Sequence, residues 1–222
     1  MGGPVYALSI SANRLGLLSS ASLVGIGVGY AIALAAGFAR HGLHEPIGDP
    51  VLAIMEVLTL LSAPAIVTLM ASIHDRAAPG RKVYGITALA FGTLCAGTTS
   101  VVHFVELTAA RQLGGGGIVW PSRIYAAELL AWDVFLGFAL MFAALVFDGD
   151  GPESTVRRAL FACGVLCLAG TVGPFVGNMR LQLIGVAGYA GVLPVVSLLL
   201  ARLFARAAAQ LGVAPDGASP RR

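Results

Sequence analysis

Five side chains that can exchange protons lie within or at the ends of long apolar segments: Glu56, His103, Glu106, Glu128 and Asp133. His103 and Glu106 belong to the stretch SVVHFVELTAAR and, being three residues apart, share one face of a helix. An imidazole exchanges protons near neutral pH, and a carboxyl group withdrawn from water can serve as a general acid or base. The residue types therefore predict acid–base catalysis by these five residues.

Three carboxylates, those of Glu56, Glu128 and Asp133, are the most costly members of this set. A carboxylate at membrane depth costs at least ~2.5–3.5 kcal/mol on insertion scales, so such residues usually face the interior of a helix bundle. We expect the three to face one another inside a bundle. Asp133 would form the floor of a pocket, and His103 and Glu106 would form its outer rim.

Each of these assignments has a structural alternative. Glu56 can pair with Arg123 or Arg180 and hold two helices together near the membrane interface. His103 and Glu106 can simply mark the end of a helix. These alternatives stay open at the level of the sequence.

Six further residues are candidates for contacting a substrate. Aromatic side chains near the carboxylates can pack against an apolar molecule, and polar side chains near the short NMR turn can hold its polar end. The candidates are Trp132, Tyr125, Phe104, Phe175, Asn178 and Arg180.

Histidines in a neighbouring loop raise the question of a metal site. His41, His44, His103 and Glu106 have side chains that suit zinc, but the loop is rich in Gly and Pro and the sequence has no HExxH motif. The single lysine, Lys82, follows a turn, so no apolar segment offers an amine for retinal. We expect neither a metal nor a cofactor.

The composition assigns the chain to a class. Hydrophobic residues make up 57% of the 222 residues, charged residues make up 11%, and the mean hydropathy is +0.86. A soluble domain has about 25% charged residues. The composition therefore predicts an integral membrane protein, and no basic cluster is dense enough to indicate a nucleic-acid partner.

The elements that must position the candidate residues follow from six apolar runs. Each run is about 20 residues or longer, which is the length that a helix needs to cross a hydrocarbon core. The runs cover 15–39, 51–74, 83–107, 122–147, 156–177 and 181–204. We expect an all-α bundle of six transmembrane helices in a single domain, residues 1–210, followed by a disordered cytoplasmic tail, residues 211–222.

Basic residues predict the orientation of this bundle, because Lys and Arg accumulate in cytoplasmic loops. Of the 14 basic residues, ten lie in or next to the N-terminus, the C-terminus and the second and fourth loops, and the other four lie in or next to the first, third and fifth loops. Both termini are therefore expected in the cytoplasm. The ends of the helices that carry His103 and Glu56 would then face the outside of the cell.

The sequence favours one class of function and leaves two others open. Acidic residues gather on the extracytoplasmic side and aromatic residues accompany them, which suits an enzyme that cyclises or isomerises a lipid or isoprenoid-like substrate. A proton- or cation-coupled carrier or channel would use the same carboxylates, and a structural membrane subunit would use them for assembly. We expect a multi-pass protein of the plasma membrane whose partners are a hydrophobic small molecule or lipid, with homo-oligomers possible.

Overall fold

A computed structural model describes residues 10–42, 47–114 and 120–212, and the regular structure in these ranges is helical throughout. Six helical stretches are long and apolar enough to cross a membrane: Ser11–Arg40, Val51–Arg76, Pro79–Ala110, Arg123–Ala144, Pro152–Val176 and Met179–Gln210. These stretches coincide with the six apolar runs apart from a few residues at their ends. The predicted all-α chain with six such helices is therefore confirmed.

Several of the six stretches contain more than one helical element. The first two are single helices, α1 (Ile10–His41) and α2 (Val51–Arg76). The third begins with a 3₁₀ turn (Pro79–Arg81), continues as α3 (Lys82–Val105) and ends in a π-helical segment (Glu106–Ala110). The fourth consists of α4 (Arg123–Leu129), a π-helical segment (Leu130–Phe135) and α5 (Leu136–Ala144).

The last two stretches are also interrupted. The fifth divides into α6 (Pro152–Gly170) and α7 (Val172–Val176), and the sixth into α8 (Met179–Val186), a π-helical segment (Ala187–Val192) and α9 (Leu193–Gly212). Gly177, with a φ of 69°, ends α7 in the left-handed region that favours glycine. Asn178 then begins α8, because its side chain accepts a hydrogen bond from the backbone N–H of Arg180 at 3.1 Å.

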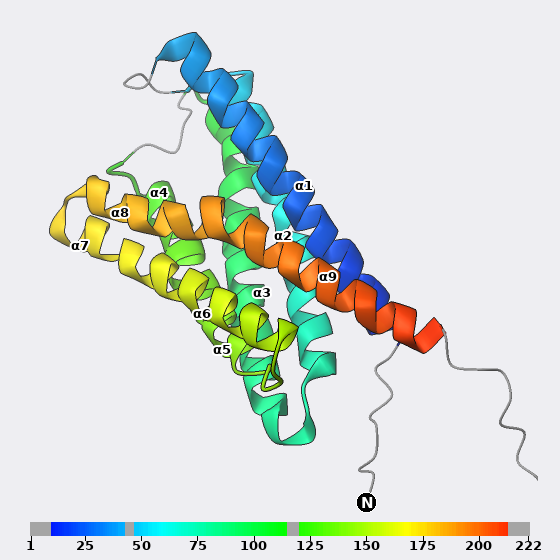
Figure 1. The fold of residues 1–222 in the computed structure, drawn as a ribbon. Helices are drawn as coiled ribbons and strands as arrows, with labels where there is room; N and C mark the ends of the chain where they lie inside the picture. The colour runs from blue at the N-terminus through cyan, green and yellow to red at the C-terminus, as the bar shows by residue number, and fades with distance from the viewer. Residues whose placement is uncertain (1–9, 43–46, 115–119, 213–222) are drawn as a thin grey trace, which may run out of the picture.

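The helices alternate between two ends of the molecule (Figure 1). One end, which we call the terminal end, holds the start of α1, the α2–α3 turn, the α5–α6 turn and the end of α9. The other, the distal end, holds the connections from α1 to α2 and from α3 to α4 together with the α7–α8 turn. Residues near His103 therefore lie at the opposite end from Lys82.

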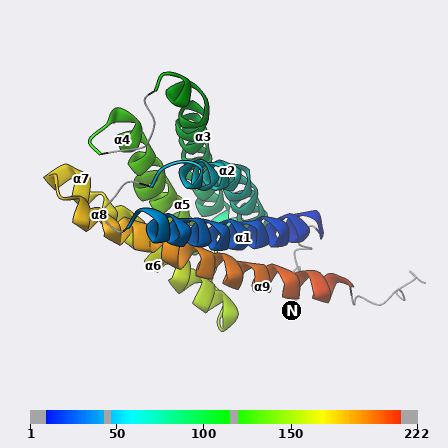
Figure 2. The same cartoon turned by 90° about the horizontal axis from the view of Figure 1, so that it is seen from above.

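Packing joins the helices into one bundle. α1 lies between α2 and α9, α2 also packs on α3, and α5 packs on both α3 and α6 (Figure 2). Backbones approach closely where α5 meets α6, since a Cβ on Gly164 would lie 2.6 Å from the carbonyl oxygen of Gly137. Large apolar side chains such as Leu18 and Ile32 remain more than 60% exposed, as expected for a surface that faces lipid.

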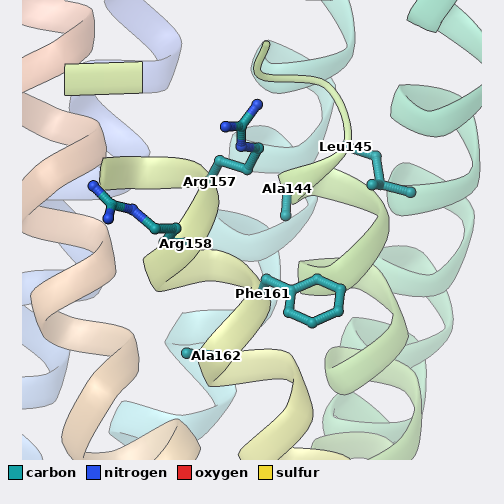
Figure 3. Close-up of a pocket in the computed structure, with 6 residues that line it drawn as sticks. All are labelled: Ala144, Leu145, Arg157, Arg158, Phe161 and Ala162. Atoms are coloured by element: carbon teal, nitrogen blue, oxygen red, sulfur yellow. The ribbon is translucent and has the colours of Figure 1, made fainter. Parts of the chain in front are cut away.

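Ion pairs connect the two turns at the terminal end. Arg76 pairs with Glu153 at 2.6 Å, and Arg81 pairs with Asp148 at 3.0 Å. Beside them a groove of about 310 Å³ lies between α5 and α6 (Figure 3). Its lining consists of four apolar residues and two arginines, and so supplies no carboxyl or imidazole group for acid–base chemistry.

Candidate functional site

A cavity of about 880 Å³ opens among the first, second, third, fourth and sixth helical stretches in the distal half of the bundle. This volume lies within the range of about 300–1,000 Å³ that is typical of small-molecule sites. Most of the wall is apolar. The wall also contains the hydroxyl side chains of Thr59 and Ser62. Its acidic, basic and polar aromatic side chains are Asp49, Glu56, His103, Arg111, Glu128, Tyr30, Trp120, Tyr125, Trp132 and Tyr189.

His103 and Glu128 form a pair across two helices on this wall. His103 Nε2 lies 2.9 Å from Glu128 Oε1, with the imidazole side chain 5% exposed and the carboxylate side chain 14% exposed. An ionised carboxylate can only accept, so Nε2 then carries the hydrogen and donates it, which leaves Nδ1 of the neutral ring as an acceptor. The pair is thus arranged as a carboxylate that orients an imidazole, the arrangement of a general base.

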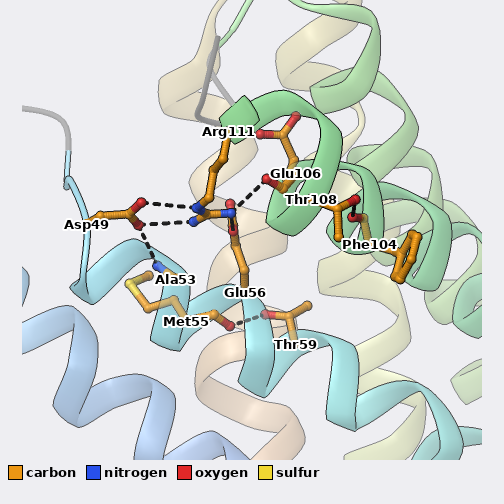
Figure 4. A network of polar contacts seen from close by, with 9 residues as sticks. All are labelled: Asp49, Ala53, Met55, Glu56, Thr59, Phe104, Glu106, Thr108 and Arg111. Atoms are coloured by element: carbon orange, nitrogen blue, oxygen red, sulfur yellow. Dashed lines mark hydrogen bonds and ion pairs between the residues drawn. The ribbon is translucent and has the colours of Figure 1, made fainter. Parts of the chain in front are cut away.

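The second polar group of the cavity is a network around Arg111 (Figure 4). Its guanidinium donates to both carboxylate oxygens of Asp49 at 3.0 Å, and its Nη1 lies 2.7 Å from Glu56 Oε2. Nη1 also donates to the backbone carbonyl of Glu106 at 2.7 Å. All three guanidinium nitrogens are therefore used within the protein.

This network ties the beginning of α2 to the end of the third helical stretch. Asp49 precedes α2 and also accepts from the backbone N–H of Ala53 at 3.1 Å, so one carboxylate caps a helix and holds Arg111. Glu56 is 2% exposed, and Arg111 supplies the positive charge that such a buried carboxylate needs. The partner of Glu56 is thus Arg111, rather than the Arg123 or Arg180 considered from sequence.

The ion pair between Asp49 and Arg111 gives the protein a testable pH dependence. Hydrogen bonds from Arg111 hold the pKa of Asp49 below its usual value. A carboxyl group with a lower pKa in the folded state stabilises the protein above its unfolded pKa of about 3.9, and this contribution disappears as the pH falls through the folded pKa. Asp49→Asn should therefore lower the thermal unfolding midpoint near neutral pH, with the difference from wild type shrinking below about pH 4.

The matched control is Asp75→Asn, which removes one exposed acid at the terminal end of the bundle. Thermal unfolding of the three proteins in detergent, followed across the pH range, should separate only Asp49→Asn from wild type. A midpoint for Asp49→Asn that matches wild type at neutral pH would show that this pair contributes nothing to stability.

Asp133 lies outside this cavity. It is 0% exposed, and its Oδ1 lies against the backbone of Gly170 and Gly185, where a Cβ at either glycine would crowd it. Its neighbour Trp132 lines the cavity instead. Successive residues of a helix point in different directions around its axis, and here the two side chains serve different interfaces. Asp133 is therefore not the floor of the pocket, and only Glu56 and Glu128 of the three carboxylates line the cavity.

Three π-helical segments shape this region, and nothing in the sequence indicated them. They are Glu106–Ala110, Leu130–Phe135 and Ala187–Val192, and each either contains a cavity residue or leads directly to one. A π turn inserts one extra residue and changes the direction of the side chains around it; such turns are frequent at functional sites. Tyr189, in the third segment, is fixed by Gln182, whose Nε2 donates to its hydroxyl at 2.9 Å.

Several residues expected to bind substrate point elsewhere. Phe104 is 62% exposed and Phe175 is 88% exposed, so both face outward from the bundle. Asn178 and Arg180 are exposed and form the cap of α8. Glu106 is buried at 5% and contributes its backbone carbonyl to Arg111 rather than a side chain to the cavity wall.

Two of the residues expected to contact a substrate, Tyr125 and Trp132, do line the cavity.

The possible metal site included His44, which lies outside the described residues, and His41, whose side chain also lies outside them. Within the described part of the chain, no group of three His, Cys, Asp or Glu side chains could hold a metal.

No family model, curated protein or solved structure matches the chain. The functional argument therefore depends on the cavity and on the residues that line it.

Proposed function

We propose that this chain is a multi-pass protein of the plasma membrane that binds a hydrophobic small molecule or lipid in its distal cavity and cyclises or isomerises it. The observation that carries the proposal is the His103–Glu128 pair on the wall of a largely apolar cavity of about 880 Å³. An apolar wall selects an apolar molecule, and a few convergent polar groups fix its orientation.

In this proposal His103 exchanges a proton with the substrate, and Glu128 orients the ring and stabilises the imidazolium that forms. Proton transfer by a positioned side chain requires the acid or base to lie within hydrogen-bond reach of the reacting atom, and both residues line the cavity. Glu56 and Arg111 act as positioning residues that close the distal end of the cavity. Asp133 supports the helix that carries Glu128 and Trp132.

Cyclisation and isomerisation preserve molecular mass, which makes the proposal testable without a known substrate. Lipid extracts of cells that express the wild-type chain should contain a compound whose mass matches that of another species but whose chromatographic retention differs. Extracts from cells that express His103→Gln at the same level should lack it. Identical extracts from both would contradict the enzymatic proposal.

The orientation is part of the proposal: both termini lie in the cytoplasm and the cavity lies on the extracytoplasmic side. The native cysteines Cys95, Cys163 and Cys167 are buried, so an introduced cysteine reports its own location. In intact cells, a membrane-impermeant maleimide should label Leu113→Cys, which lies at an 84% exposed position of the distal end. It should label Ala78→Cys, at the terminal end, only after permeabilisation, and the reverse pattern would overturn the orientation.

A further inference from the structure

The charges around the cavity are unbalanced. Among the described residues, its lining contains three carboxylates, those of Asp49, Glu56 and Glu128, but a single guanidinium and a single imidazole. With all three carboxylates ionised, the lining carries two surplus negative charges when His103 is neutral and one when it is protonated. A ligand that enters the cavity therefore meets a net negative wall.

The guanidinium of Arg111 is already fully used in contacts within the protein. Arg111 uses its three guanidinium nitrogens on Asp49, Glu56 and the backbone of Glu106 at 2.7–3.0 Å. A ligand carboxylate or phosphate would have to displace one of these partners, and would leave Glu56 without its cation. Anionic ligands are therefore disfavoured.

Acceptors, by contrast, are in surplus. Glu128 Oε2 and Glu56 Oε1 are buried and have no hydrogen-bond partner within the described residues. A buried acceptor without a donor is costly, so a ligand that brings positive charge or donors next to these carboxylates gains free energy.

Aromatic rings complete the environment. Trp132 and Tyr189 lie with ring centroids 5.5 Å apart at 52°, and Trp120 and Tyr125 lie 6.1 Å apart at 63°. These four rings all line the cavity. Indole and phenol faces attract cations, and combined with carboxylates they form the kind of site that binds organic ammonium groups.

We propose that the ligand of this cavity is an amphipathic organic cation, with an ammonium-type head among Glu128, Trp132 and Tyr189 and an apolar tail against the first and sixth helical stretches. This inference rests on the proposed function, in that it takes the cavity to be the ligand site. It adds the charge of the ligand, which the acid–base proposal does not specify.

The chain carries its own reporter for the test. Both of its tryptophans, Trp120 and Trp132, line the cavity, so intrinsic tryptophan fluorescence responds to a ligand that enters it. The full chain in phosphatidylcholine nanodiscs would be titrated with three probes that share a twelve-carbon tail: dodecyltrimethylammonium, dodecanol and dodecanoate. Nanodiscs without protein correct for partition of each probe into the bilayer.

We expect the ammonium probe to bind about tenfold more tightly than the alcohol, and the carboxylate probe to bind more weakly than both. Glu128→Gln should abolish the preference for the cation, whereas Asp75→Asn, a change of equal charge at the terminal end, should preserve it. Should Glu128→Gln fail to fold, Trp132→Leu provides a second test, because it removes an aromatic face and leaves Trp120 as the reporter.

The possible outcomes separate the two proposals. Equal binding of cation and alcohol, or tighter binding of the carboxylate probe, would overturn the cationic ligand and leave the cavity as a site for apolar molecules. Failure of all three probes to change the fluorescence would instead contradict the proposed function at its binding step.

Discussion

Replacing His103 by glutamine should slow turnover by about 10²–10⁴-fold, the usual contribution of a positioned general acid or base. Glutamine retains a hydrogen-bonding side chain of similar length but cannot exchange a proton. The ring of His103 sits 2.9 Å from Glu128, so Glu128→Gln should also reduce the rate, because the imidazolium formed during the reaction would lose its anion. The measurement is the rate of product formation in purified protein, once the equal-mass pair has been identified in lipid extracts.

A solvent isotope distinguishes loss of proton transfer from loss of structure. In deuterium oxide the wild-type protein should introduce deuterium into the product. The variants His103→Gln and Glu128→Gln should lose turnover and still elute from a sizing column as folded, monodisperse protein. Asp133→Asn is the informative comparison, since Asp133 lies behind the cavity wall. A result in which Asp133→Asn abolishes turnover and His103→Gln retains it would transfer the catalytic role to Asp133.

The largest effect on stability is expected for Arg111→Met, which should cost about 3–5 kcal/mol. The change leaves Glu56, 2% exposed, as a buried carboxylate without its cation, and it also removes both hydrogen bonds from Arg111 to Asp49. Unfolding in mixed micelles with increasing denaturant would measure the loss. Arg180→Met removes an exposed arginine from the same end of the bundle and should change stability by no more than about 0.5 kcal/mol.

A double variant tests the reason for this loss. Removing the charge of Glu56 as well, in Arg111→Met with Glu56→Gln, should recover a large part of the lost stability, because no uncompensated buried charge remains. Should the double variant be as unstable as the sum of the two single changes, the two residues would be energetically independent. The 2.7 Å contact between them would then contribute little to the fold.

The sequence alone predicted the six helices and the withdrawal of the carboxylates from the surface. Both follow from local physics: a run of about 20 apolar residues fits a hydrocarbon core, and a carboxylate in lipid is costly wherever the chain places it. Glu56 and Asp133 are accordingly almost fully buried. Such properties depend on residue type and segment length, which the sequence contains directly.

The partners of these residues could not be predicted in the same way. Sequence spacing paired His103 with Glu106, three residues away, whereas its contact is with Glu128, 25 residues away on another helix. Arg111 lies in what reads as a polar turn, and its contact with Asp49 spans 62 residues. Both contacts depend on how helices pack, which no short pattern encodes.

The direction of the Asp133 side chain could not be predicted from the sequence, for a different reason. Its depth in the bundle follows from its position along the fourth apolar run, but its direction depends on the π-helical segment Leu130–Phe135. A helix with regular turns throughout would rotate one half of the run relative to the other. Propensities of single residues do not reveal where such a turn occurs, so the sequence could indicate that Asp133 is buried and still assign it to the wrong interface.

The π-helical segments also affect how the sequence of this chain should be aligned with related sequences. A π turn contains one residue more than the α-helix around it, so the loss of one residue between 130 and 135 would restore a regular helix while Glu128 and Leu136 kept their faces. We therefore expect alignments of homologous sequences to contain single-residue gaps inside an otherwise unbroken helix at 106–110, 130–135 and 187–192. An alignment that forbids gaps within helices would put the residues on one side of each segment out of register.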